Sequence, residues 1–229
     1  MSKKTKMLII VLSAVVLTVS TVVGTLAYFT SSVEIVNTFT VGKVALKLDE
    51  AVTDENGVAE DVTFRTESGR NYKMLPGNSY YKDPTVTVKG GSDASYVRVI
   101  IAVNNADVIN AIVEAEKNGL DGKFEGFLIG WDKDNWEYVG RYDNVEEGEI
   151  GFELRYRTDS GAKITTASDA DQKLPTVFTG IRVPGAINAQ ELAAIQDLSV
   201  RTEAHAIQAS GFDNNEDGAW AAFEAQMNG

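Results

Sequence analysis

Apolar and polar residues alternate with a period of two along several short stretches, and this pattern constrains the fold more than any other feature of the chain. The clearest case is residues 149–157, whose apolar face consists of Ile150, Phe152, Leu154 and Tyr156. The same alternation occurs in residues 44–48, 85–88, 96–103 and 198–208. Because successive side chains of a strand point to opposite faces, each stretch predicts a strand with one buried face.

Turn-forming sequences rich in Gly, Asn, Asp and Pro separate these stretches, at 54–57, 76–78, 89–92, 132–135 and 159–161. Many short strands joined by turns indicate a β-sandwich or barrel. Helical spacing predicts only short helices, over residues 107–118, over residues 189–196 and from about Asp217 through Phe223. No repeat or charge block divides the chain after residue 28, so we expect one mainly β domain.

The first 27 residues have the pattern of a secretory signal peptide. Three lysines precede an uncharged apolar run over residues 7–23. Thr25 and Ala27 then provide small residues at the −3 and −1 positions of a signal-peptidase cleavage site. We therefore expect cleavage between Ala27 and Tyr28. The alternative is a retained transmembrane anchor, because no charge occurs between Lys6 and Glu34.

Composition excludes several function classes. The chain contains no cysteine and a single histidine, His205, so disulfides, thiol nucleophiles and two-histidine zinc sites are excluded. Removal of residues 1–27 leaves 18 basic and 33 acidic residues, a net charge of −15 compared with −12 for the whole chain. A surface this acidic repels phosphate backbones, so nucleic acid is not an expected partner.

Several blocks of sequence resemble the TasA and camelysin family of exported proteins. They are Gly24-Thr25-Leu26-Ala27-Tyr28-Phe29-Thr30, Asn37-Thr38-Phe39-Thr40-Val41-Gly42, Leu75-Pro76-Gly77, Asp83-Pro84-Thr85-Val86-Thr87-Val88, Ala94-Ser95-Tyr96-Val97-Arg98-Val99, and Ala204-His205-Ala206-Ile207-Gln208-Ala209 before Gly211-Phe212. The blocks span both ends of the chain, whereas residues 105–195 carry no matching motif.

The resemblance implies a jelly-roll β-sandwich with a few short helical insertions, secreted by a Gram-positive bacterium. It also implies processing by a dedicated SipW-type signal peptidase and assembly into fibres of the extracellular biofilm matrix. In this family, subunits join by donor-strand exchange, in which the freed N-terminal strand of one subunit fills a groove in the next. An accessory protein that anchors or nucleates the fibre would be a further partner.

The segment 28–42 suits a donor strand, with alternating residues at Val33, Ile35, Asn37, Phe39 and Val41. Main-chain hydrogen bonds would supply affinity and the alternate side chains would fix the register. The residues alone are equally consistent with a first strand in the chain's own sheet, and the resemblance favours donation. Cleavage at Ala27 would then trigger assembly, since an attached signal holds Tyr28 at the membrane.

Residues 213–224 match a calcium-loop pattern, with Asp213, Asn215, Asp217 and Glu224 as ligands and Gly218 at the turn. The residues before this loop have the pattern of a strand, whereas a calcium loop of this kind normally follows a helix. The simpler interpretation is an acidic loop in which Asp217 caps a helix. Calcium is therefore the one cofactor that the sequence suggests.

Two other groups of residues allow a chemical interpretation. The aromatic residues Trp131, Trp136, Tyr138 and Tyr142 are consistent with a sugar-binding platform, but cross-strand pairs of a hairpin are favoured. His205 alternates with alanines, which is typical of a surface or lightly buried strand residue. Camelysin-like proteins have been classed as metalloproteases, but this chain lacks a zinc-ligand pair.

The sequence thus predicts a signal peptide (1–27), a donor-strand segment (28–42) and a jelly-roll domain (43–229). The predicted function is a secreted, non-enzymatic subunit that polymerises with itself in the extracellular matrix or at the cell surface. The alternatives are a monomeric cell-surface module that binds calcium or glycans, and a camelysin-like secreted metalloprotease.

Overall fold

β-Strands dominate the structure, as the alternating pattern predicts. The computed structural model describes residues 29–32, 35–37, 43–69, 71–104, 128–142, 149–158, 161–183, 185 and 199–227. The elements are β1 (Phe29–Ser32), β2 (Ile35–Asn37), β3 (Leu46–Ala51), β4 (Arg65–Thr66), β5 (Asn71–Met74), β6 (Ser79–Tyr81), β7 (Thr85–Val88), β8 (Ser95–Asn104), β9 (Leu128–Ile129), β10 (Trp136–Tyr142), β11 (Glu149–Thr158), β12 (Gly161–Ala162), β13 (Gln172–Lys173), β14 (Gly180–Arg182), β15 (Val200–Gln208) and α4 (Glu216–Met227).

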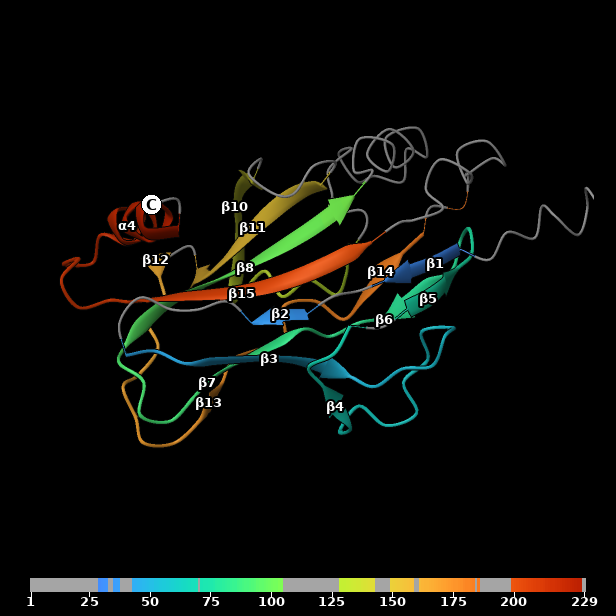
Figure 1. Ribbon diagram of the computed structural model, residues 1–229, viewed down its shortest axis with the longest axis horizontal. Helices are drawn as coiled ribbons and strands as arrows, with labels where there is room; N and C mark the ends of the chain where they lie inside the picture. Colours follow the sequence, from blue (N-terminus) through green and yellow to red (C-terminus); the bar gives the residue numbers. More distant parts are fainter. Residues whose placement is uncertain are drawn as a thin grey trace, which may run out of the picture.

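The two largest sheets form two layers. The main sheet has the order β10-β11-β8-β15-β2, with β12 attached to β11, and the second sheet has the order β13-β7-β3-β4. Figure 1 shows the main sheet above β3, β7 and β13. Smaller sheets, β6-β14-β9 and β1-β5, complete the fold, and β1, β5, β6 and β14 lie at the end opposite α4 (Figure 1). The prediction of a mainly β protein is therefore confirmed.

The core lies between these layers. Alternate residues of β8 face it, as predicted for residues 96–103: Val97, Val99, Ile101 and Val103. The prediction of only one buried face is wrong for this strand, because the residues of its other face are buried too: Tyr96, Arg98, Ile100 and Ala102. The opposite layer contributes Leu48 from β3 and Val86 and Val88 from β7. Burial of such apolar surface is the main stabilising contribution to a sandwich of this kind.

A second, smaller cluster fixes α4 on the main sheet. Trp220 and Phe223 of the helix pack with Tyr96 and Ile207, which come from β8 and β15. The helix predicted near Asp217 is thus confirmed, although it begins one residue earlier, at Glu216. The helices predicted over 107–118 and 189–196 lie outside the described residues. Among the residues described, no helix has the length and apolar character needed to cross a membrane.

Two glycines in left-handed backbone conformation offer a matched test of the packing. Gly57 has φ +72° and a Cβ there would lie 2.6 Å from Cδ1 of the buried Tyr80, whereas Gly91 has φ +82° and open space around it. Gly91→Ala should cost about 1 to 2 kcal/mol of unfolding free energy, because only the backbone is strained. Gly57→Ala should cost clearly more, since Tyr80 must also move. Urea denaturation of both variants measures the difference; equal losses would contradict the tight contact with Tyr80.

Candidate functional site

The edge of the main sheet is formed by β2, within the predicted donor segment. This strand pairs in parallel with β15, with Ile35 beside Thr202 and Asn37 beside Ala204. The other side of β15 pairs with β8 over nine residues, and Thr202 and Ala204 are fully buried. Strand β2 therefore covers Thr202–Ala204 on the edge of β15 that faces away from β8.

The rest of the described N-terminal segment pairs elsewhere. Strand β1 is antiparallel to β5, with Phe29 beside Met74 and Ser32 beside Asn71. In the single chain, this segment thus pairs with its own domain, which is the self-complemented arrangement. Of the other predicted site residues, the cleavage residues Ala27 and Tyr28 and the donor-strand residues Val33, Phe39 and Val41 lie outside the described residues.

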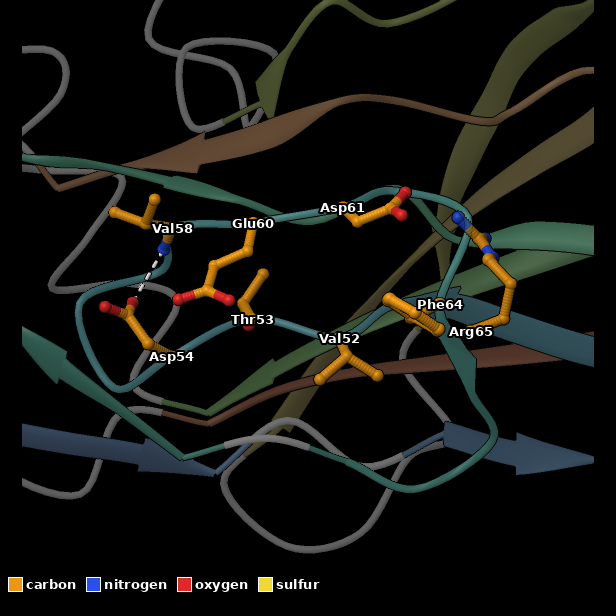
Figure 2. A pocket seen from close by; sticks show the side chains of 8 residues that line it. All are labelled: Val52, Thr53, Asp54, Val58, Glu60, Asp61, Phe64 and Arg65. Atoms are coloured by element: carbon orange, nitrogen blue, oxygen red, sulfur yellow. Dashed lines mark hydrogen bonds between the residues drawn. The ribbon is translucent and has the colours of Figure 1, made fainter.

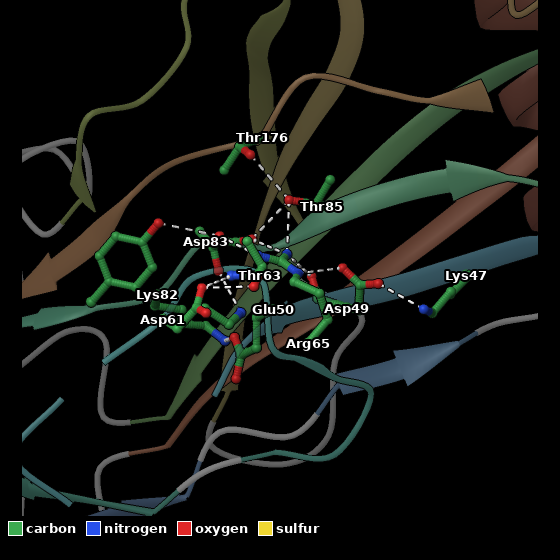
Figure 3. A network of polar contacts seen from close by, with 12 residues as sticks. Lys47, Asp49, Glu50, Asp61, Thr63, Arg65, Lys82, Asp83, Thr85 and Thr176 are labelled. Carbon is green, nitrogen blue, oxygen red and sulfur yellow. Dashed lines mark hydrogen bonds and ion pairs between the residues drawn. The ribbon is translucent and has the colours of Figure 1, made fainter. Parts of the chain in front are cut away.

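A buried polar network joins β3 to the residues before β7 (Figure 3). Arg65 donates from Nε to Asp49 Oδ1 at 2.9 Å and from Nη1 to Asp83. Burial opposes the charge of Arg65, but its hydrogen bonds to Asp83 and Asp49 raise its pKa overall. Asp83 also accepts the backbone N–H of Ala51 at 2.6 Å. These contacts hold the C-terminal end of β3, where its backbone pairing with β7 stops.

The loop between β3 and β4 forms an open groove of about 510 Å³. Figure 2 shows its lining side chains, which are Val52, Thr53, Asp54, Val58, Glu60, Asp61, Phe64 and Arg65. Phe64 is 67% exposed and Val58 57%. The carboxylate of Asp54 accepts the backbone N–H of Val58, and this bond lowers its pKa. The acidic groups Asp54 and Asp61 therefore serve the local turns, and the groove is mainly an apolar surface.

His205 lies in a buried cluster beneath α4. Its Nδ1 accepts a hydrogen bond from Arg98 Nε at 3.2 Å, and its ring stacks on Phe223 with centroids 5.1 Å apart. Burial, followed by the positive charge of Arg98, lowers the pKa of His205 to about 3. The expectation of a surface or lightly buried residue is therefore wrong: the side chain is buried, and the imidazole is neutral at neutral pH.

Arg98 is the centre of this cluster. It is 1% exposed, and its guanidinium carbon lies 4.4 Å from the ring centroid of Trp220. It also forms ion pairs with Glu224 of α4 and with Glu153 of β11. Since a buried cation needs such partners, the helix and the sheet depend on each other at this point.

Three of the four predicted calcium ligands bind separate partners within the chain. Asp217 Oδ1 lies 2.6 Å from Arg155 Nη1, and Glu224 binds Arg98. Asn215 Oδ1 accepts the backbone N–H of Gly218 at 3.0 Å, so Asn215, and not Asp217 as expected, caps α4. Asp213 adopts φ +48° in the preceding turn. Within the described residues, no group of three or more His, Asp or Glu side chains is placed to hold a metal ion.

The aromatic residues do not form the expected hairpin. Strand β9 before the turn 132–135 pairs with β14, whereas β10 after it pairs with β11, so the turn connects two sheets. Trp136 is fully buried and packs on Tyr156 of β11 at a centroid distance of 5.4 Å. A buried indole cannot offer a face to a sugar, so Trp136 is a core residue.

Comparison of the chain with models of known families, with curated proteins and with solved structures finds no match. The likeness to the TasA and camelysin family stays an expectation from the quoted sequence blocks.

The calcium loop can be tested directly. We expect calcium to produce no saturable heat in a calorimetric titration, because binding would separate Asp217 from Arg155 and Glu224 from the buried Arg98. Asp213→Ala should leave the titration unchanged, as should Asp54→Ala in a distant acidic turn. A saturable signal that Asp213→Ala alone removes would establish the site.

The neutral His205 predicts a defined loss of stability in acid. Its pKa is about 3 in the folded chain and 6.5 as the reference value, so the unfolded chain binds the extra proton between these limits. The unfolding free energy should be unaffected by His205 above pH 6.5 and should fall below it, by up to about 1.4 kcal/mol per pH unit.

The variant His205→Asn isolates this contribution. An asparagine oxygen can accept the Arg98 hydrogen bond but does not titrate. Urea denaturation from pH 7.5 to pH 4 should show a wild-type curve that falls more steeply than that of the variant. Parallel curves would mean that His205 is not buried in its neutral form.

Proposed function

We propose that the mature protein is a secreted structural subunit that polymerises into extracellular fibres by donating its N-terminal strand to the next copy. The observation that supports it most is the position of β2, a three-residue parallel strand at the edge of the main sheet. So short a strand makes few backbone hydrogen bonds, so little stabilising free energy is lost when it leaves β15.

The surface that β2 covers is well suited to capture a strand. An exposed edge of β15 presents unpaired backbone groups, and these form a template for another chain. The identical segment of a second copy satisfies the same groups, so exchange replaces each contact by its equivalent. Because every subunit both donates and accepts, exchange that does not close between two copies or within a ring continues from subunit to subunit and yields a filament.

Processing would control this exchange. Residues 1–27 carry the basic and apolar pattern of a signal peptide, and removal at Ala27 by a SipW-type peptidase frees a segment that begins directly before β1. The mature chain then has a strong net negative charge, which keeps subunits soluble before they meet. We assign no catalytic step to the protein.

The proposal predicts that fibres require residues 28–42. Negative-stain electron microscopy of the mature protein beginning at Tyr28 should show concentration-dependent fibres, and the form beginning at Lys43 should remain monomeric. A variant at Ala27 that retains the signal should form no fibres. If both mature forms stay monomeric at high concentration, with or without calcium or mild acid, the proposal is wrong.

A peptide experiment provides the control. A synthetic peptide of residues 28–42 should raise the thermal midpoint of the form beginning at Lys43, because it fills the edge of β15. The same peptide with Val36→Pro lacks a backbone donor in the middle of β2 and should bind less tightly. Equal effects of the two peptides would show that pairing with β15 is not the mode of binding.

A further inference from the structure

An ion pair lies on the core face of the second sheet. Strand β3 pairs with β7 so that Leu48 lies beside Val86 and Asp49 beside Thr85. Continuing this register by one pair places Glu50 opposite Pro84, which makes Lys82 its diagonal neighbour on the same face. This is also the face of Leu48 and Val86, both of which belong to the core.

Both charged side chains are excluded from water. The side chain of Lys82 is 0% exposed and that of Glu50 is 1% exposed, and Lys82 Nζ lies 2.5 Å from Glu50 Oε2. No described residue gives a hydrogen bond to the second carboxylate oxygen, Glu50 Oε1. The pair is therefore less well satisfied than the Arg65 network on the opposite face, which has several partners (Figure 3).

A dry environment favours the neutral forms of such a pair. Transfer of the hydrogen-bonded proton from Lys82 to Glu50 gives an amine and a carboxylic acid, which avoids two buried charges. Burial lowers the pKa of Lys82, although the charges of Glu50 and Asp83 oppose this. A neutral lysine amine is a nucleophile, and here it touches the carboxyl group that it would attack.

We propose that Lys82 and Glu50 become joined by an isopeptide bond in the folded protein. The amine nitrogen attacks Cδ of Glu50, and a new N–C bond forms. One C–O bond of the carboxylic acid then breaks, and the departing hydroxyl leaves as water with a proton from the nitrogen. The product is an amide and one water molecule, so no oxidant, reductant or further reactant is needed.

The surrounding structure keeps the two groups in place. Asp49 and Ala51, on either side of Glu50, are held to Arg65 and Asp83, and Asp83 follows Lys82 directly in the chain. Groups fixed at contact distance react far faster than the same groups in solution, because the loss of motional freedom has already occurred on folding. The bond would connect residues 32 apart in sequence.

The intact mass of the folded mature protein tests the proposal. Mass spectrometry should give a value lower than the sequence mass by one water, and proteolysis should release a branched peptide that contains both Glu50 and Lys82. Hydroxylamine, which opens a succinimide formed at an Asp-Gly site such as Asp217-Gly218, should leave this mass unchanged. The full sequence mass in the folded wild type would overturn the proposal.

Two variants localise the reaction. Lys82→Gln removes the amine and should have the full sequence mass for the variant. Lys47→Gln is the matched control, because Lys47 pairs with Asp49 of the same strand, 2.9 Å away but partly exposed, and its product should still lack one water. If Lys82→Gln does not fold, the branched peptide of the wild type still decides the matter. The measurement uses monomeric protein, so its outcome does not depend on fibre formation.

Discussion

The long antiparallel pairing of β8 with β15 is the contact on which the other features depend. It runs from Val200 beside Val103 to Gln208 beside Ser95 and joins segments about a hundred residues apart. One face of the pair supplies the core, and the other face carries Arg98 and His205 beneath α4. The free edge of β15 receives β2. The core, α4 and the edge of β15 that pairs with β2 therefore all depend on this one pair of strands.

The sequence predicts both strands of this pair, although not their pairing, because the signal of a strand is local. Alternation in 96–103 and 198–208 marks the face that enters the core, and this pattern is visible in the chain itself. The burial of the other face under α4, at Arg98 and His205, has no such local signal. The sheet to which each strand belongs likewise has no local signal. The turn 132–135 has the composition of a hairpin turn, yet its flanking strands join different sheets. A turn sequence specifies a change of direction, whereas the partner of each strand depends on contacts that are distant in sequence.

The candidate sites were harder to predict for a related reason. The calcium pattern specifies oxygen ligands at set spacings, but it contains no information on Arg98 and Arg155, which bind Glu224 and Asp217. Likewise, Lys82 has no local signal that it is buried. The alternation Leu46, Leu48, Glu50 does place a carboxylate at a core position, and this was an available indication. A charge at such a position implies a buried partner, although its identity follows only from the register of β3 and β7.

The N-terminal segment that pairs with β15 and the buried Lys82–Glu50 pair are connected through β3. The N-terminal segment precedes β3 in the chain. Under the proposed strand donation, a pull by the acceptor would reach β3 through Lys43 and Ala45, whose carbonyls accept the backbone N–H groups of Asp93 and Lys89. Without a cross-link, β3 can separate from β7 one hydrogen bond at a time, because peeling breaks ladder bonds in sequence. Glu50 lies at the far end of this ladder, and its partner Lys82 belongs to the segment before β7. The proposed covalent bond would stop peeling before β3 leaves the core. Without that bond the pair would still resist peeling, because its separation leaves two buried polar groups without hydrogen-bond partners.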